Sequence, residues 1–199
     1  MRALAVAVSL IIGLAQASLA FEFPALYRVI DVASNDVLNV RAAPDAQSEI
    51  IGEFQHDQSG IEIVALSDDR GWGQVNVGGQ SGWTSMRFLQ REAEATSPLR
   101  AECFGTEPFW NLTLGATHVL REPGQGSQPY QATAELSAAN TTNSIAILGH
   151  SPAGNMTATI DAAQCSDGMS DRLFGLSIGL VLTGGDSPRY LTGCCSLAP

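Results

Sequence analysis

The chain has 199 residues, of which 45% are hydrophobic, and its 20 acidic side chains outnumber its 10 basic ones to give a net charge of −10. A chain this acidic is repelled by phosphate backbones and by anionic membrane surfaces, so composition argues against a nucleic-acid partner. The length suits one medium domain or two small ones.

The first twenty residues predict a signal peptide (1–20). An early arginine precedes the apolar run Ala3–Leu14, and small residues precede a cleavage point after Ala20. The run is shorter than the roughly 20 apolar residues of a spanning helix, although a retained N-terminal anchor is the alternative. No cysteine follows the cleavage point, so the lipobox of a lipoprotein is missing. We therefore expect a periplasmic or secreted protein that does not insert into a membrane after cleavage.

The cysteines predict two disulfides. An even number of cysteines in an exported chain favours disulfides over a zinc site, because no CxxC pair and no neighbouring histidine is present. A bridge between the adjacent Cys194 and Cys195 is disfavoured, since neighbours in a strand point to opposite faces. Two pairings remain, and we favour Cys165–Cys194 with Cys103–Cys195.

The pattern of apolar residues predicts an all-β protein with two domains. Short stretches rich in Val, Ile, Leu and Thr alternate with turn residues, and no stretch has a sustained helical period. Strands are expected at 27–32, 37–40, 61–66, 72–77 and 81–84. A polar, proline-containing linker at 91–100 separates a domain at 24–90 from a second domain at 101–199.

The segments LNVRAAPDAQSEIIGEF, GWGQVNVGG and SGWTSMRFL, between residues 38 and 89, resemble a bacterial SH3 domain. The resemblance implies a small β-barrel that binds cell-wall peptides or acts as an adapter. Aromatic faces offer a large contact area, so Tyr27, Trp72, Trp83 and Phe88 are the candidate ligand-binding residues. The core of so small a barrel is the alternative location for Trp83.

The second half predicts an antiparallel β-barrel or sandwich. Strands are expected at 109–115, 117–121, 130–137, 144–149, 155–163, 173–183 and 189–195, with the longest irregular loop at 123–129. The stretches CFGTEPFW, CSDGMSDRLF and LTGCCS resemble an uncharacterised family of small exported bacterial β-barrels with GTEPFW, CxDGMSD and Gly-Cys boxes. This second resemblance implies a fold and no activity.

The boxes supply a candidate surface made of Glu107, Trp110, Asp167, Asp171 and Arg172. The CSDGMSDR stretch has too few oxygens for a calcium loop, so no metal and no cofactor is expected. Its spacing permits a pair of catalytic carboxylates without requiring one. Turn formation explains it better, since Asp-Gly favours a turn and Glu107 is placed to pair with Arg172.

These observations favour an exported binding or adapter protein that is not an enzyme, with cell-wall peptide or an envelope protein as partner. Two alternatives remain. One is a cell-wall hydrolase that acts through Glu107, Asp167 and Asp171. The other is an enzyme inhibitor or envelope-stress protein that presents the loop 165–172.

Overall fold

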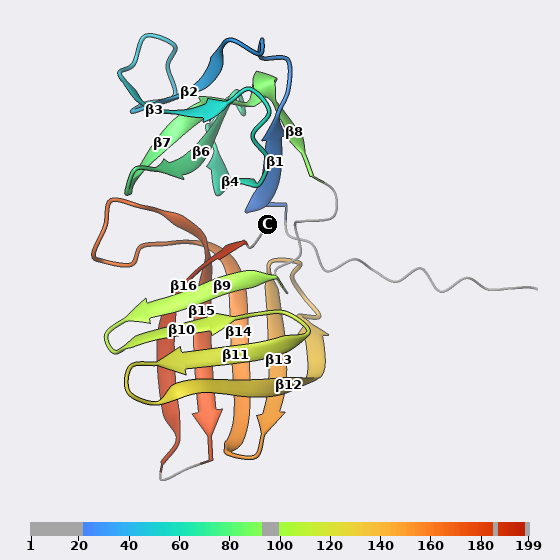
Figure 1. Cartoon of the computed structure of the whole chain (residues 1–199). Coiled ribbons are helices and arrows are strands. Elements are labelled where there is room, and N and C mark those ends of the chain that lie inside the picture. Colours follow the sequence, from blue (N-terminus) through green and yellow to red (C-terminus); the bar gives the residue numbers. More distant parts are fainter. Residues whose placement is uncertain (1–21, 93–99, 185–186, 198–199) are drawn as a thin grey trace, which may run out of the picture.

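The computed structural model describes residues 22–92, 100–184 and 187–197, and it consists of two all-β units stacked end to end (Figure 1). The N-terminal unit comprises residues 22–92 and the barrel comprises residues 100–197. The predicted signal peptide and most of the predicted linker lie outside the described residues. Among the described residues, no helix is long and apolar enough to cross a membrane.

The N-terminal unit is a small barrel-like fold built from two sheets. The sheets have the strand orders β4-β1-β8 and β3-β2-β7-β6-β5. The strands are β1 (Ala25–Val29), β2 (Val37–Arg41), β3 (Ile50–Gln55), β4 (Ile61–Ile63), β5 (Ala65–Leu66), β6 (Trp72–Val77), β7 (Gln80–Ser85) and β8 (Leu89–Arg91), and the 3₁₀ turn η1 (Met86–Phe88) lies between the last two.

Alternation of side chains forms the core of this unit. In β2, Leu38 and Val40 are buried while the residues between and beside them are partly exposed, as expected for a strand with one face on a core. Gly78 and Gly79 both have positive φ, which permits the two-residue turn between β6 and β7. The sequence therefore dictates the central hairpin locally.

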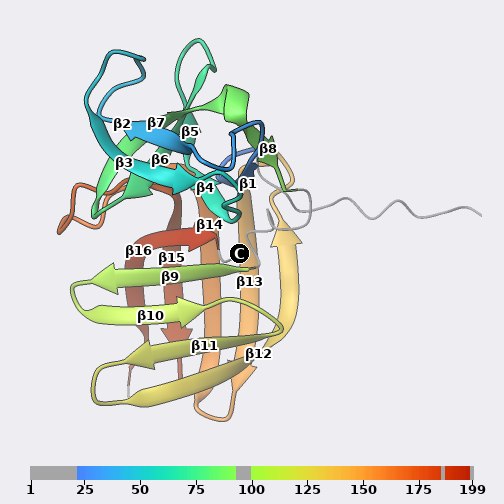
Figure 2. The same cartoon turned by 45° about the horizontal axis from the view of Figure 1, so that its top comes forward.

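The second unit is a closed antiparallel barrel, with strand order β10-β11-β12-β13-β14-β15-β16-β9 (Figure 2). Its strands are β9 (Ala101–Thr106), β10 (Phe109–Thr113), β11 (Thr117–Glu122), β12 (Gly126–Ser137), β13 (Ser144–Ser151), β14 (Gly154–Cys165), β15 (Phe174–Thr183) and β16 (Arg189–Leu197). Closure leaves the sheet without an exposed edge. The all-β prediction and the antiparallel second domain are confirmed.

Three predictions were wrong, two about the barrel and one about the end of the N-terminal unit. The segment 123–129 is not an irregular loop, because positive φ at Gly124 and Gly126 lets the chain reverse and β12 begins at once. Residue 91 belongs to β8 and not to a linker. Trp110 is not a surface residue, because it points into the barrel with only 4% of its area exposed.

Trp110 fits inside the barrel because two glycines leave room for its indole. A Cβ added to Gly105 would stand within contact distance of the Trp110 indole nitrogen, and a Cβ on Gly193 would stand 3.0 Å from its ring. Both glycines lie on inward-facing positions of β9 and β16. Trp110 is thus a core residue of the barrel.

The two units contact each other through the segment that leads into β15. Asp171 forms an isolated bridge with Gln80, and its carbonyl accepts a hydrogen bond from the Ser81 amide at 3.0 Å. The Leu173 amide donates to the Asn76 and Ser81 side chains at 3.2 and 2.9 Å, and the Asn76 amide group donates to the Leu173 carbonyl at 2.8 Å. The turn between β6 and β7 therefore holds the chain of the barrel much as a neighbouring strand would.

A second contact lies at the end of the last strand. The Leu197 amide donates a hydrogen bond of 2.9 Å to the carboxyl group of Glu62 on β4. Pro24 packs against Gly175 of β15, where an added Cβ would stand 2.9 Å from the proline ring. Three separate segments of the N-terminal unit thus contact the barrel.

Candidate functional site

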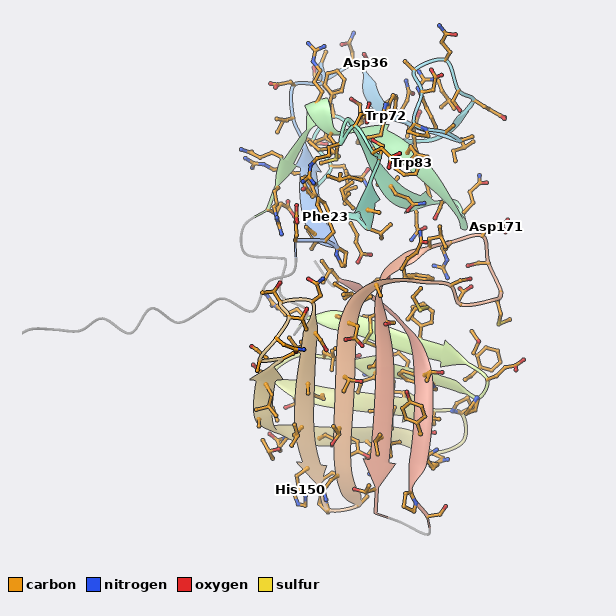
Figure 3. The ribbon with its side chains drawn as sticks, turned by 180° about the vertical axis from the view of Figure 1, so that it is seen from behind. Phe23, Asp36, Trp72, Trp83, His150 and Asp171 are labelled. Atoms are coloured by element: carbon orange, nitrogen blue, oxygen red, sulfur yellow. A yellow bond between two sulfur atoms is a disulfide. The ribbon has the colours of Figure 1, made fainter. Side chains whose placement is uncertain are left out.

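The N-terminal unit has a groove of about 560 Å³ at its end remote from the barrel. Figure 3 shows Asp36 and Trp72 at this end and Asp171 at the junction with the barrel. Apolar side chains of Val32, Trp72 and Phe88 line the groove together with the acidic Asp31 and Asp36. Size and lining fall within the usual range of small-ligand and peptide sites.

The turn before β6 presents Trp72. The Ser67 hydroxyl accepts a hydrogen bond from the Trp72 amide at 3.0 Å and donates one to Asp69 at 2.6 Å. The Asp69 carboxylate also accepts from the Gly71 amide at 2.9 Å. The Ser67 hydroxyl and then the Gly71 amide hold the pKa of Asp69 below its ordinary value. The half-buried indole is therefore held on a turn whose polar groups are satisfied.

The opposite wall comes from the loop after β1 and from η1. The Ile30 amide donates to the Phe88 carbonyl at 2.9 Å, which ties this loop to η1. Asp31 adopts a positive φ of 56°, and the Asp36 carboxylate accepts a hydrogen bond from the Val37 amide at 2.8 Å. A short aromatic floor is thus bordered by two acidic side chains.

Among the residues that the structure describes, Arg41 is the one basic residue lining this groove. Its guanidinium donates to the Ser48 carbonyl at 2.6 Å, so part of its hydrogen-bonding capacity is engaged within the unit. With two carboxylates against one engaged arginine, the groove favours a ligand that carries a positive charge beside an apolar group.

The four aromatic residues expected in one site do not all meet. Trp72 and Phe88 line the groove. Tyr27 is 7% exposed and belongs to the core, where its strand pairs with both β4 and β8. Trp83 is half-buried on β7, opposite Arg41 and Gln74, and does not line the groove. The sequence did not single out Asp31 and Asp36, because isolated acidic residues in loops have no distinctive pattern.

In the CSDGMSDR loop, Asp167 organises the turn. Its carboxylate accepts hydrogen bonds of 2.9 Å from the Met169 amide, the Ser170 amide and the Ser170 hydroxyl, and its side chain is only 6% exposed. Burial alone would raise the pKa of Asp167, but these hydrogen bonds hold it below its ordinary value. Gly168 has a positive φ of 69°, as a tight turn requires. This carboxylate is committed to the loop.

The sequence suggested that Arg172 pairs with Glu107, but Arg172 instead contacts Asp167 within its own loop. It lies 3.6 Å from the Asp167 carboxylate and its guanidinium stacks over the Phe174 ring at 5.2 Å. The GTEPFW and CSDGMSDR boxes are joined instead by the Thr106 hydroxyl, which donates to the Asp167 carbonyl at 3.2 Å. Glu107 remains exposed.

Two disulfides hold this end of the barrel, in the pairing that we favoured from the sequence. Cys165 is joined to Cys194, which fixes the start of the loop to the outer face of β16. Cys103 is joined to Cys195 between the neighbouring strands β9 and β16. The loop 165–172 is therefore fixed at its start by a disulfide and at its end by the N-terminal unit.

No group of three or more His, Cys, Asp or Glu side chains among the described residues is arranged to hold a metal ion. Glu107, Asp167 and Asp171, the acidic residues of the hydrolase alternative, do not supply two free carboxylates that face one site. Asp167 is engaged in its turn, Asp171 lies at the junction of the two units, and Glu107 lies on the hairpin between β9 and β10.

Comparison with known protein families matches residues 36–90 to the bacterial SH3 domain. The matched segment runs from β2 into β8 and includes Trp72 and Phe88 of the groove. No curated protein and no solved structure matches the chain at a significant level. The resemblance of the barrel to a family with GTEPFW and CxDGMSD boxes stays a prediction.

Proposed function

We propose that this chain is an exported binding or adapter protein whose N-terminal groove takes an extended peptide of the cell wall or of an envelope protein. The observation that carries the proposal is the groove itself, in which Trp72 and Phe88 meet within a bacterial SH3 domain. Bacterial domains of this class commonly bind cell-wall peptides or proteins. Two disulfides agree with a location outside the cytoplasm.

The lining of the groove narrows the chemistry of this peptide. Trp72 and Phe88 accept an apolar side chain or a flat peptide unit, and Asp31 and Asp36 attract an amino group. We therefore favour a peptide that bears a free amine close to a small apolar residue. Because Asp31 and Asp36 are exposed, their attraction should weaken as salt is added.

A structural role, and not catalysis, is proposed for Asp167 of the barrel. The Asp167 carboxylate is occupied by three hydrogen bonds, which supports a structural role for it. An acid with a lowered pKa is a poor proton donor at neutral pH. The hydrolase and inhibitor alternatives lack a comparable supporting observation.

Co-sedimentation with purified cell-wall sacculi tests this proposal. We expect Trp72→Ala to reduce the pelleted fraction several-fold, while Ile50→Ala, an exposed apolar residue outside the groove, pellets like the wild type. Asp31→Asn keeps a residue that tolerates positive φ, so it should lower affinity without disturbing the loop. Equal pelleting of Trp72→Ala and wild type, with unchanged far-UV spectra, would refute this role for the groove.

A further inference from the structure

The outer face of the barrel has a second groove, of about 690 Å³, that the binding function described above does not use. It lies over β14, β15, β16 and β9 and is bordered by the loop 165–172. Its floor follows from the register of the strands. One row across the sheet consists of Thr159, Gly179 and Thr192, and the next row contains Asp161 and Ser177.

This floor is shallow because its side chains are small, and it is rich in hydroxyl groups. The hydroxyl groups come from Thr159, Ser177 and Thr192. Each of these side chains points outward, because its neighbours on the same strand point into the barrel. Thr106 adds a further hydroxyl group at the β9 edge. Thr159 and Thr192 stand two strands apart, about 10 Å, with Gly179 between them, and Ser177 lies diagonally beside both. A hydroxyl group both donates and accepts hydrogen bonds, as the hydroxyl groups of a sugar do.

An aromatic platform borders the floor at Tyr190, which is 67% exposed. A Cβ added to Gly179 would stand 2.9 Å from the Tyr190 hydroxyl oxygen and 3.3 Å from its ring carbon Cε2. The phenol therefore extends across the bare backbone of β15 and leaves much of its surface open to solvent. Met169 also lines the groove and is 68% exposed on the turn that Asp167 holds in place.

The charges around this groove select its ligand. Asp161 and Glu107 line it, and no side-chain hydrogen bond or ion pair of either carboxylate is found among the described residues. In the part of the chain that the structure describes, no arginine lines it, and Arg172 lies over Phe174 beside Asp167. An anionic ligand would be repelled, whereas carboxylates accept hydrogen bonds from paired hydroxyl groups.

We propose that this groove binds a neutral oligosaccharide. One pyranose ring stacks on Tyr190, its neighbours exchange hydrogen bonds with the hydroxyl groups of the floor, and their own hydroxyl groups donate to the Asp161 carboxylate. The Cys165–Cys194 bridge and the Asp167 turn hold the wall of the groove in place before binding, which lowers the entropic cost of association. A cationic peptide is the competing ligand. It would bind the carboxylates and make no use of the hydroxyl groups of the floor.

Calorimetric titration of the full chain with neutral tetrasaccharides, namely the β1,4-linked tetramer of N-acetylglucosamine, cellotetraose and maltotetraose, tests this assignment. We expect one of them to bind, with little dependence on salt. Tyr190→Ala should weaken binding about five- to tenfold through loss of the platform. Gly179→Ala should weaken it too, because the added Cβ would stand 2.9 Å from the Tyr190 hydroxyl and 3.0 Å from the Thr159 hydroxyl and would displace these two side-chain ends from the floor.

Two controls separate this site from the N-terminal groove. Leu136→Ala removes an exposed apolar side chain of β12 outside the groove and should bind saccharide like the wild type. Trp72→Ala should also bind saccharide normally, even if it fails to pellet with sacculi. The assignment is overturned if none of the three saccharides binds, if Tyr190→Ala binds as tightly as wild type, or if trilysine binds where the saccharides do not.

Discussion

Protonation of Glu62 should control the stability of the contact between the two units. This residue lies on β4, and its carboxyl group accepts the Leu197 amide of the last barrel strand at 2.9 Å. Burial raises the pKa of Glu62 to about 7, while the Leu197 amide and the Ser196 hydroxyl lower it in part. The perturbation is Glu62→Gln, which keeps an acceptor for Leu197 and removes the charge.

The sign and the size follow from proton linkage. Because the folded pKa lies above the ordinary value, the stabilising contribution is full below about pH 4.5 and is lost as the pH rises through 7. With an unfolded pKa of about 4.3 and a folded one of about 7, the loss from pH 5 to pH 8 is about 2.5 kcal/mol. Glu62 retains some solvent contact, so we expect a fall of roughly 1–2 kcal/mol.

Urea unfolding at pH 5 and pH 8 measures this effect, with wild type and Glu62→Gln compared at each pH so that other titrating groups cancel. The wild type should lose stability relative to the variant as the pH rises. Glu53→Gln on the exposed face of β3 is the matched control and should track the wild type. A difference between wild type and Glu62→Gln that is the same at both pH values would refute the reasoning.

Two further predictions concern the junction and the disulfides. Asn76→Ala should lower the free energy of unfolding by about 1–3 kcal/mol, because the amide and the carbonyl of Leu173 both lose the Asn76 side chain as a hydrogen-bond partner. The hydrogen-exchange protection of the Leu173 amide should fall as well, and unchanged protection would contradict this role. Replacing Cys103 and Cys195 by serine should lower the free energy of unfolding by about 4.6 kcal/mol, since this bridge spans 92 residues. Replacing Cys165 and Cys194, whose bridge spans 29 residues, should lower it by about 3.6 kcal/mol, and urea unfolding measures both losses. A larger loss from the shorter bridge would argue against the loop-entropy account.

Side-chain alternation predicted most of the strands. It predicted β13, which buries Ile145, Ile147 and Gly149 in strict alternation, but it missed the first barrel strand β9. The strand β3 was missed because Phe54 is its one fully buried residue, so its sequence lacks a two-residue period. A strand with one buried side chain gives little pattern to detect.

The candidate site was predicted in part, and the misses have tertiary causes. Aromatic identity pointed to Trp72 and Phe88, but it does not tell a groove from a core, and Tyr27 lies in the core. Trp110 was placed on the surface because the glycines that make room for it come from β9 and β16, 5 and 83 residues away in the chain. Only the register of the closed barrel brings them together.

The two ends of the loop 165–172 make different contacts, which the sequence of the loop alone does not predict. Its first part, including Met169, borders the groove on the barrel, and Asp171 at its end meets the N-terminal unit. One short segment thus contributes to a binding surface and to the junction between the units.

This arrangement has a consequence for how the two grooves would work together. If both bind, a fixed junction presents them at a constant separation, so a polymer that carries peptides on a glycan chain would engage the second groove at a high effective concentration once the first is filled. Loosening the junction at Asn76 would leave each groove intact and lower the avidity for the polymer. Two sites held in a fixed relation would therefore bind such a polymer more tightly than either site binds its separate fragments.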